Sequence, residues 1–467
     1  MAFVLPARTH TYLDAHWEAN LETTRAFLRQ PSISAQSVGL RETADGLRAQ
    51  LEARGGQVSY HGDPSRPILF GEWNVGAART LLVYGMYDVQ PVDGQQWSTP
   101  PFAAEIVEHA GGPRLVARGA CNSKGPLMAM MHAIDALRAT SGLPVNLKWT
   151  IEGEEEIGSQ HLPGFYETHR ELLRADAAFE PFWSQHRLDG PPVVTLGTKG
   201  VIGLEFVCES GDWGGPRDDL HSSDGAWIGS PAWRLMQALT TLVNEYQELT
   251  VDGLPELGEM LPGDEALLRK MAETFDPAER LAEVGATRFK RDLPAFELLR
   301  QVGFAPALNI NGLESGYQGA GSHTIIPSRA RALTDLRLAP GMQVDTTFAA
   351  ISEHLARRGF GDIQISMDSG YPAARTAVGA PVIQALTGAY RAHGFEPIIR
   401  PLEPSATPYF LFTDVLGLDF AWGGLGTAAG SHGPDEWCSL AGLSALEKSI
   451  ATFLVSFAGI SDIPAAA

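Results

Sequence analysis

The chain has 467 residues, a formal net charge of −20 and 44% hydrophobic residues. This length exceeds what a single hydrophobic core ordinarily supports, so the composition predicts a globular protein of two domains. The negative charge excludes a nucleic-acid-binding protein, because such proteins need clustered Lys and Arg side chains to displace counterions from the phosphates.

The sequence also argues against a membrane or secreted protein. It contains no uninterrupted apolar run of ~18 residues, and residues 1–8 lack the charged start and long apolar run of a signal peptide. Cys121, Cys208 and Cys438 form neither a paired framework nor a zinc-ribbon spacing, which is typical of a reducing compartment. We therefore expect a cytoplasmic protein without disulfides and without membrane contact.

The first part of the chain alternates helices and strands. Residues 11–29 predict an amphipathic helix, and residues 80–84 are a short apolar run typical of a buried central strand. Pro126 opens a second predicted helix, residues 127–138, because its missing N–H costs little in the first turn. Residues 145–151 alternate apolar and polar side chains, as a strand does. This order predicts an α/β domain with a mixed central sheet flanked by helices.

The pattern changes near residue 200. Residues 203–208 and 331–338 predict strands, and residues 347–358 predict a helix, which together form a β-α-β-like unit. We therefore predict an α+β domain inserted into the first one. The predicted boundaries are 1–199 for the first part of the α/β domain, 200–372 for the inserted domain and 373–467 for the second part of the α/β domain.

Polar residues follow two of the predicted strands of the first domain. Asp88 comes shortly after residues 80–84, and an acidic run, residues 154–156, follows residues 145–151. In open α/β sheets, ligands bind at the edge where the strands end. We therefore expect a site at this edge.

Three segments carry a family resemblance: residues 84–91, 118–126 and 152–159. They resemble the M20 family of di-zinc peptidases and aminoacylases, and the likeness continues in the same order through nearly the whole chain. Residues 87–91 and 97–102 are most similar to the carnosinase-type dipeptidase branch. The resemblance implies an amide-bond hydrolase for a small dipeptide-like or N-acyl amino acid substrate with a carboxylate. It also implies that the inserted domain is a lid that forms a homodimer.

The resemblance assigns roles to four residues. Hydrolysis of an amide needs an activated water, which a metal ion supplies, and a carboxylate that carries the proton to the leaving amine. By motif position, Glu155 matches the proton shuttle and Glu156 a metal ligand. His432 matches the last metal ligand of the family. Glu180 is the nearby acid for a further ligand, although it stands a residue or two from the expected place.

Two positions depart from the family pattern. Met86 replaces a His, and its thioether is a poor ligand for zinc among oxygen donors. Asn122 replaces the bridging Asp, and a neutral amide cannot share negative charge between two cations. Glu156 and Glu180 alone do not balance the charge of two zinc ions. The sequence therefore predicts one zinc ion at most, or none if the site is fully degenerate. Asp88 then either keeps the family's supporting position beside the missing His or hydrogen-bonds to backbone.

The inserted domain supplies the residues that the resemblance links to substrate. His221 matches the lid His that reaches into the partner subunit's active site to stabilise the oxyanion. Arg337 matches the arginine that grips a substrate carboxylate as a bidentate fork. Thr324 and Asn309 belong to the same lid surface, with ordinary sheet-surface roles as the alternative.

A further candidate is Ser405, in the predicted loop of residues 403–408. This loop stands where many relatives have a Gly-Gly-Ser turn that lets backbone amides approach the substrate carboxylate. Pro404 removes one donor and fixes φ, so we expect a reshaped anion pocket and a different substrate shape.

Three alternatives remain open. In the first, Glu155 is the acid and base of a metal-independent enzyme that catalyses amide formation, cyclisation or elimination. In the second, the chain is a catalytically silent binding protein that keeps the cleft. Met86, Cys121 and Cys438 lie near the site motifs, which is the pattern of a soft-metal site or a cysteine nucleophile. The ordinary expectation for Cys121 is a buried, inert thiol.

Overall fold

Strand β3 (Thr80–Met86) lies inside a six-stranded sheet with the order β1-β2-β6-β3-β7-β18. All its residues except the first are buried, which explains its continuous apolar sequence. β3 pairs in parallel with β6 and β7, whereas β1 and β2 run antiparallel to their neighbours. The sheet is therefore mixed, as predicted. Its other strands are β1 (Gln57–His61), β2 (Ile68–Trp73), β6 (Asn146–Glu152), β7 (Ala177–Pro181) and β18 (Phe420–Gly423).

The computed structural model describes residues 6–460 and divides into two compact units. Unit 1 contains the chain up to Leu196, Thr376–Arg400 and the chain from Leu411 on. Unit 2 contains Gly197–Arg375 and Pro401–Phe410. Compared with the boundaries drawn from the sequence, residues 401–410 lie with the inserted unit, because β17 (Glu403–Ala406) pairs with β9 (Gly197–Glu209).

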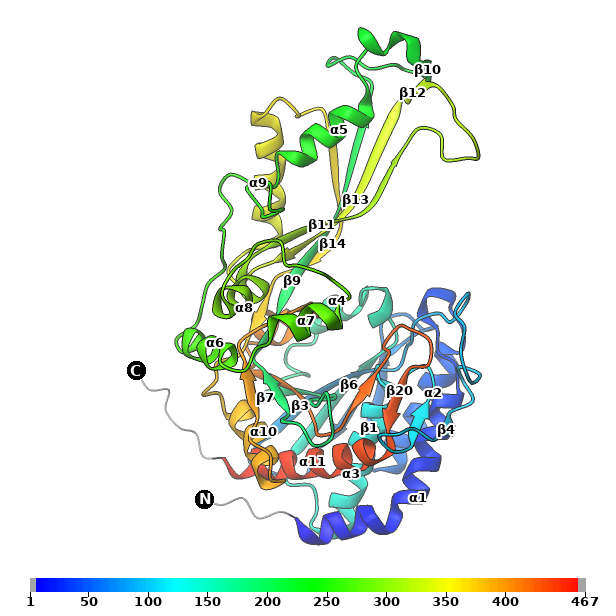
Figure 1. Cartoon of the computed structure of the whole chain (residues 1–467). Helices are drawn as coiled ribbons and strands as arrows, with labels where there is room; N and C mark the ends of the chain where they lie inside the picture. The colour runs from blue at the N-terminus through cyan, green and yellow to red at the C-terminus, as the bar shows by residue number, and fades with distance from the viewer. Residues whose placement is uncertain (1–5, 461–467) are drawn as a thin grey trace. The chain divides into compact units, whose positions relative to one another are not determined.

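Helices flank the sheet of unit 1 (Figure 1). The α/β fold class expected from the sequence is confirmed. Helix α11 packs against α1, α3 and α10. By length and mean hydropathy, 1.3, α11 passes for a membrane span, yet 67% of that stretch is buried, as in a core helix. The helices are α1 (Ala7–Arg29), α2 (Leu40–Ala53), α3 (Lys124–Thr140), α4 (Leu162–Thr168), α10 (Pro381–Ala392) and α11 (Leu440–Gly459).

A small sheet positions two loops of the candidate site. β20 (Trp437–Ser439) pairs antiparallel with β5 (Arg114–Val116), with Trp437 opposite Val116. The pairing brings the loop after β5 next to the loop before β20. The remaining strands of unit 1 are β4 (Glu105–Val107) and β19 (Ala428–Ala429) in this sheet, and β8 (Val193–Thr195) with β16 (Ile398–Arg400) in a parallel pair.

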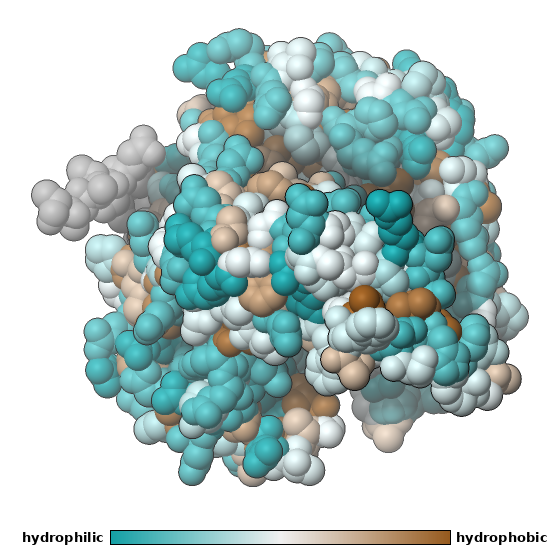
Figure 2. Space-filling view, turned by 90° about the horizontal axis from the view of Figure 1, so that it is seen from above, coloured by the Kyte–Doolittle hydropathy of each residue, from teal (hydrophilic) through white to brown (hydrophobic). Residues whose placement is uncertain are grey.

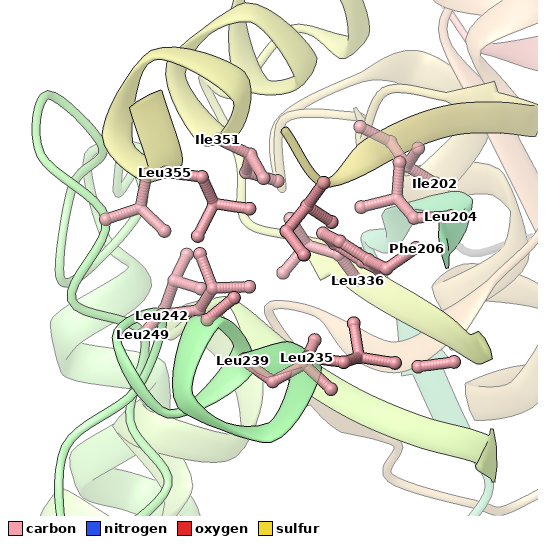
Figure 3. Packing of buried hydrophobic residues seen from close by; sticks show 14 of the residues in the cluster. Ile202, Leu204, Phe206, Leu235, Leu239, Leu242, Leu249, Leu336, Ile351 and Leu355 are labelled. Carbon is pink, nitrogen blue, oxygen red and sulfur yellow. The ribbon is translucent and has the colours of Figure 1, made fainter. Parts of the chain in front are cut away.

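Unit 2 is built on a twisted antiparallel sheet with the order β11-β13-β9-β14. One face carries the apolar residues of β9 and β13 at every second position, and these pack against α5 and α9, as Figure 3 shows. The predicted strands 203–208 and 331–338 lie within β9 and β13. The other elements are β10 (Leu220–His221), α5 (Pro231–Thr240), α6 (Asp264–Ala272), α7 (Pro277–Glu283), α8 (Ala295–Phe304), β11 (Ala307–Ser315), β12 (Ile325–Ile326), β13 (Arg329–Leu338), α9 (Val344–Arg357), β14 (Gln364–Tyr371) and β15 (Ala374–Arg375).

The surface agrees with a globular protein. The face seen in Figure 2 is mostly hydrophilic, with small apolar patches between polar side chains. Cys121, Cys208 and Cys438 are all buried and free.

The packing of α1, α10 and α11 generates a pH-dependent stability. Burial lowers the pKa of His393 to about 4. Its Nε2 lies 3.0 Å from Oγ1 of Thr452, and its ring lies 5.2 Å from the ring of His10. The unfolded chain protonates this side chain near its ordinary pKa of 6.5, so it binds more protons than the folded chain between pH 6.5 and pH 4. Stability therefore falls as the pH drops through this window.

We expect a His393→Gln variant to lose part of this acid sensitivity. The measurement is urea unfolding of the variant and the parent protein at pH 7, 5.5 and 4.5. His16→Gln, a change at an exposed position of α1, is the matched control. Equal slopes of stability against pH for the His393 variant and the parent would contradict the assignment.

Candidate active site

The candidate site lies where β3 and β6 end in unit 1. The two strands are parallel neighbours, with Met86 opposite Glu152, so the segments that follow them lie at the same edge of the sheet. Asp88 follows β3, and a single 3-10 turn, Glu155–Ile157, follows β6. This is the edge at which the sequence placed the site.

Asp88 fixes the turn that carries the two glutamates. Its carboxylate is fully buried and accepts hydrogen bonds from the backbone N–H groups of Glu155, at 3.2 Å, and Glu156, at 3.0 Å. Burial raises the pKa of Asp88 to about 7. Of the two roles considered for Asp88, backbone hydrogen bonding is the one that the structure shows. Met86, at the end of β3, is 4% exposed and buried.

Three side chains from distant segments meet in what we call the Asn122 cluster: Asn122, Glu156 and His432. Asn122 Nδ2 donates to Glu156 Oε1 at 2.9 Å and lies 3.2 Å from His432 Nε2. His432 Nε2 lies 3.2 Å from Glu156 Oε2, which also accepts from Gln90 Nε2 at 2.8 Å. Glu156 is 3% exposed at its side chain and His432 is 55% exposed.

The proton on His432 follows from this geometry. Its Nε2 cannot donate to Glu156 and accept from Asn122 at the same time. The hydrogen bond with Glu156 raises the pKa of His432, which favours the form that donates to the carboxylate. The amide of Asn122 therefore donates its hydrogen bond to Glu156 and not to His432.

Glu155 differs from its neighbour in its surroundings. It is half-buried on the same turn. Burial raises the pKa of Glu155 well above its usual range, and the charges of Glu156 and Asp88 raise it further. A carboxyl group with a raised pKa suits proton transfer near neutral pH. The proton-shuttle role that the resemblance implies for Glu155 stays a prediction.

The donor set does not fit a dinuclear zinc centre. Asn122 turns an N–H donor, not a lone pair, toward Glu156. Glu180 lies on β7, is 6% exposed and adds to the negative charge around Glu155. Among residues 6–460, no group of three or more His, Cys, Asp or Glu side chains is arranged to hold a metal ion. Of the predicted ligands, Glu156 and His432 are thus brought together, and Glu180 does not complete a set of three.

A buried ion pair that sequence reasoning missed anchors the cluster. Arg118 Nη1 donates to Glu436 Oε2 at 2.7 Å, and both side chains are 1% exposed. The other carboxylate oxygen, Oε1, accepts from the backbone N–H groups of Cys121, at 2.9 Å, and Asn122, at 2.8 Å. Arg118 Nη2 donates to the carbonyl of His432 at 3.2 Å. The pair therefore positions both ends of the Asn122 cluster.

Other buried charges also escaped the sequence analysis. Glu152 accepts from the hydroxyls of Tyr84, at 2.7 Å, and Ser159, at 2.8 Å, and burial raises its pKa to about 8. Lys124 donates to the carbonyl of Gln30 at 2.5 Å, and burial lowers its pKa to about 7. Both residues lie inside the motif segments, and this position was the only sign in the sequence that they belong to the site. Their burial was not visible in the sequence.

The cysteines show no sign of nucleophilic activation. Burial raises the pKa of Cys121 to about 12, and it raises the pKa of Cys438 as well. Since the thiolate is the nucleophile, these environments disfavour a cysteine mechanism at neutral pH. Ser431 Oγ lies 3.1 Å from Cys121 Sγ.

In unit 2, His221 and Thr324 come together at one end of the sheet. β10 pairs antiparallel with β12, with His221 opposite Ile325. His221 Nε2 lies 3.4 Å from Thr324 Oγ1, and its Nδ1 lies 2.9 Å from Ser223 Oγ. This two-stranded sheet stands at the tip of unit 2 in Figure 1.

Arg337 and Asn309 lie toward the other end of β13, a strand of ten residues that spans roughly 30 Å. Arg337 Nε lies 3.2 Å from Asp335 Oδ2, and Asn309 Nδ2 donates to Asp335 Oδ1 at 3.2 Å. His221 and Arg337 of one chain are therefore far apart within unit 2. Asp335 was not singled out in the sequence, although it stands two residues before Arg337.

The prediction of a loop around Ser405 is wrong. Residues 403–406 form β17, which pairs in parallel with β9 beside Lys199. Pro404 is compatible with this strand because the pairing is irregular between Glu403 and Ala406. Ser405 itself is exposed.

Breaking the ion pair should destabilise unit 1. We expect Arg118→Met to cost about 3 kcal/mol, because it leaves the Glu436 carboxylate buried without its charged partner. Differential scanning calorimetry should show Tm lowered by several degrees. The control is Arg187→Met, which breaks an ion pair with side chains 78% and 73% exposed and should change little. Equal Tm values for the two variants would contradict the anchoring role.

Comparisons with known proteins complete the description of the chain. Residues 82–456 match the family model described as peptidase family M20/M25/M40. The Cys-Gly metallodipeptidase dug1 of Schizosaccharomyces pombe is 29% identical over 325 residues, which cover 67% of this chain and 65% of that protein. The human Beta-Ala-His dipeptidase is 28% identical over 372 residues, covering 74% and 70% of the two chains. The chain thus spans slightly less than two thirds of the fission-yeast relative.

Solved structures give the same grouping. The M20 family metallo-carboxypeptidase Sso-CP2 from Sulfolobus solfataricus is 31% identical, with a TM-score of 0.86 over 94% of this chain and 99% of that one. Human carnosine dipeptidase 1 shares the fold, with a TM-score of 0.78 at 24% identity over 98% of this chain and 100% of that one.

Proposed function

Since the chain belongs to peptidase family M20/M25/M40, which its residues 82–456 match, we propose that it hydrolyses the amide bond of a small dipeptide-like or N-acyl amino acid substrate. Two of the relatives that support this class are named as dipeptidases. The observation that supports the proposal most directly is the position of Glu155, on a turn held by Asp88 and beside the Asn122 cluster.

In this proposal Glu155 moves the proton. Its carboxylate takes a proton from the attacking water, whose oxygen adds to the amide carbon, and returns it to the nitrogen as the C–N bond breaks. Glu156 and His432 lie in the same site, with Glu156 on the turn that carries Glu155. The turn fixed by Asp88 keeps Glu155 and Glu156 in a constant relative position.

Substrate binding is assigned to unit 2. Arg337 binds the substrate carboxylate, Asn309 and Ser405 are further candidates for substrate binding, and His221 with Thr324 stabilises the oxyanion. Because His221 and Arg337 lie toward opposite ends of the sheet of unit 2, one site that uses both draws them from two copies. This supports a homodimer in which His221 serves the partner's site.

The proposal includes at most one metal ion. The fission-yeast relative is named a metallodipeptidase, yet the donor set here does not fit a dinuclear centre, so the steps above involve this chain's own side chains alone. Glu156 and His432 are the ligands for a single zinc ion, if one binds.

A second candidate function is a metal-independent acid/base reaction on the same fold, such as amide formation, cyclisation or elimination. The Asn122 amide favours it, because its N–H engages Glu156 in the place of a cation. Glu155 would then act as acid and base in that reaction as well.

Glu155→Gln tests the catalytic assignment. We expect kcat on a panel of L-dipeptides and N-acyl amino acids to fall by about 10²- to 10⁴-fold, with KM nearly unchanged, because the amide cannot carry the proton. Glu167→Gln, at an exposed position of α4, is the control. Unchanged turnover in the Glu155 variant contradicts its role. Absence of turnover by the parent protein on the whole panel favours a silent binding protein.

Metal analysis tests the cofactor. We expect the purified chain, equilibrated with zinc and dialysed, to retain at most one zinc ion per chain by inductively coupled plasma mass spectrometry. Asn122→Asp restores a charged oxygen donor, and calorimetric titration should show zinc binding at least about tenfold tighter than in the parent. Two zinc ions per parent chain would overturn the proposed stoichiometry.

A further inference from the structure

One face of the unit 2 sheet is covered by α5 and α9, and the other carries a polar group of residues near the end of β13. Leu336 and Ile202 point into the covered core. Because side chains alternate along a strand, Arg337 and Asp335 of β13 lie on the opposite face, as does Lys199 of β9. Asn309 of β11 stands directly across from Asp335 and joins them.

Asp335 is the centre of this group. Its Oδ2 lies 3.2 Å from Arg337 Nε, and its Oδ1 accepts from Asn309 Nδ2 at 3.2 Å. Asn309 is held in turn by Asn311, whose Oδ1 lies 2.6 Å from the same Nδ2. Both oxygens of Asp335 are thus engaged. The side chain of Arg337 is 38% exposed and that of Asp335 is 20% exposed, so the guanidinium is the more accessible of the two.

The contact with Asp335 determines which donors of Arg337 face a ligand. A guanidinium has two edges that each match a carboxylate, one of them built from Nε and a terminal nitrogen and the other from the two terminal nitrogens. Asp335 lies at Nε and therefore occupies the first edge. The second edge suits one carboxylate in bidentate geometry.

The surrounding charges are balanced. Lys199 is 3% exposed, donates to the carbonyl of Ala305 at 2.6 Å, and has its pKa lowered to about 8 by burial and by the nearby Arg337. Opposite Asp335 on β9 stands Gly203, where a Cβ would lie 3.6 Å from Cβ of Asp368. Two cations and two carboxylates therefore share this region. A ligand that brings a second carboxylate next to Arg337 meets the negative charge of Asp335, which already contacts that guanidinium.

We propose that Asp335 determines substrate specificity: it orients Arg337 for a single carboxylate and rejects substrates with a second carboxylate next to the first. The inference rests on the proposed function and names its substrate class. The preferred substrates are dipeptide-like compounds whose C-terminal residue has a neutral side chain. Compounds that end in Asp or Glu are disfavoured. Asp335 acts through Arg337, so it is a positioning residue.

Binding measurements in the full-length Glu155→Gln protein test this without interference from hydrolysis. The probes are glycyl-L-alanine and glycyl-L-aspartate, and the readout is Kd by isothermal titration calorimetry. With Asp335 present, we expect glycyl-L-alanine to bind at least about tenfold tighter than glycyl-L-aspartate. Asp335→Asn keeps an oxygen acceptor for Arg337 but removes the charge, so the ratio should fall below about threefold. Asp335→Ala should weaken glycyl-L-alanine about tenfold, because Arg337 loses its orientation.

Asp368→Asn is the matched control, since it removes a charge from the same region without touching the partner of Arg337. Its ratio should stay within about threefold of the parent ratio. An unchanged ratio in Asp335→Asn, or no binding of either dipeptide to the parent, overturns the inference. If the binding ratios hold but the protein with Glu155 intact turns over neither dipeptide, the proposed hydrolysis fails and the inference stands.

Discussion

The candidate site depends on one buried ion pair, Arg118 with Glu436. Glu436 receives the backbone N–H of Asn122, and Arg118 donates to the carbonyl of His432, so two segments over 300 residues apart are held in register. The pair is costly to bury, and it is retained with its hydrogen bonds satisfied at the carboxylate. Its effect is geometric: together with the pairing of β20 and β5, it keeps Asn122 and His432 beside Glu156.

Asp88 provides the second constraint. A carboxylate buried behind the turn would ordinarily add repulsion to a site that already contains Glu155 and Glu156. By accepting the two backbone N–H groups of that turn, it instead fixes the glutamates at the end of β6. Burial raises the pKa of Glu155, and the charges of Glu156 and Asp88 raise it further, so the turn holds a carboxyl group that keeps its proton more readily than a free glutamate does.

Local patterns in the sequence predicted much of the fold and part of the site. The apolar run at residues 80–84 and the alternation at residues 145–151 predicted β3 and β6, because strand periodicity is a local property. The pairing of Arg118 with Glu436 leaves no local pattern, since the partners are 318 residues apart. Asp335 was missed because a carboxylate on an exposed sheet face has the same sequence pattern as ordinary solvated surface. Strand β17 was missed because a segment that contains proline is typical of a loop.

The course of the chain has a consequence for engineering. Residues 401–410 belong to unit 2, while the stretches on either side belong to unit 1. The polypeptide therefore passes between the units four times. A single excision cannot remove unit 2, and an exchange of this unit with a relative must transplant two separate stretches of the gene together, one of them only about ten codons long. Recombination at one crossover point would leave β9 without its β17 neighbour.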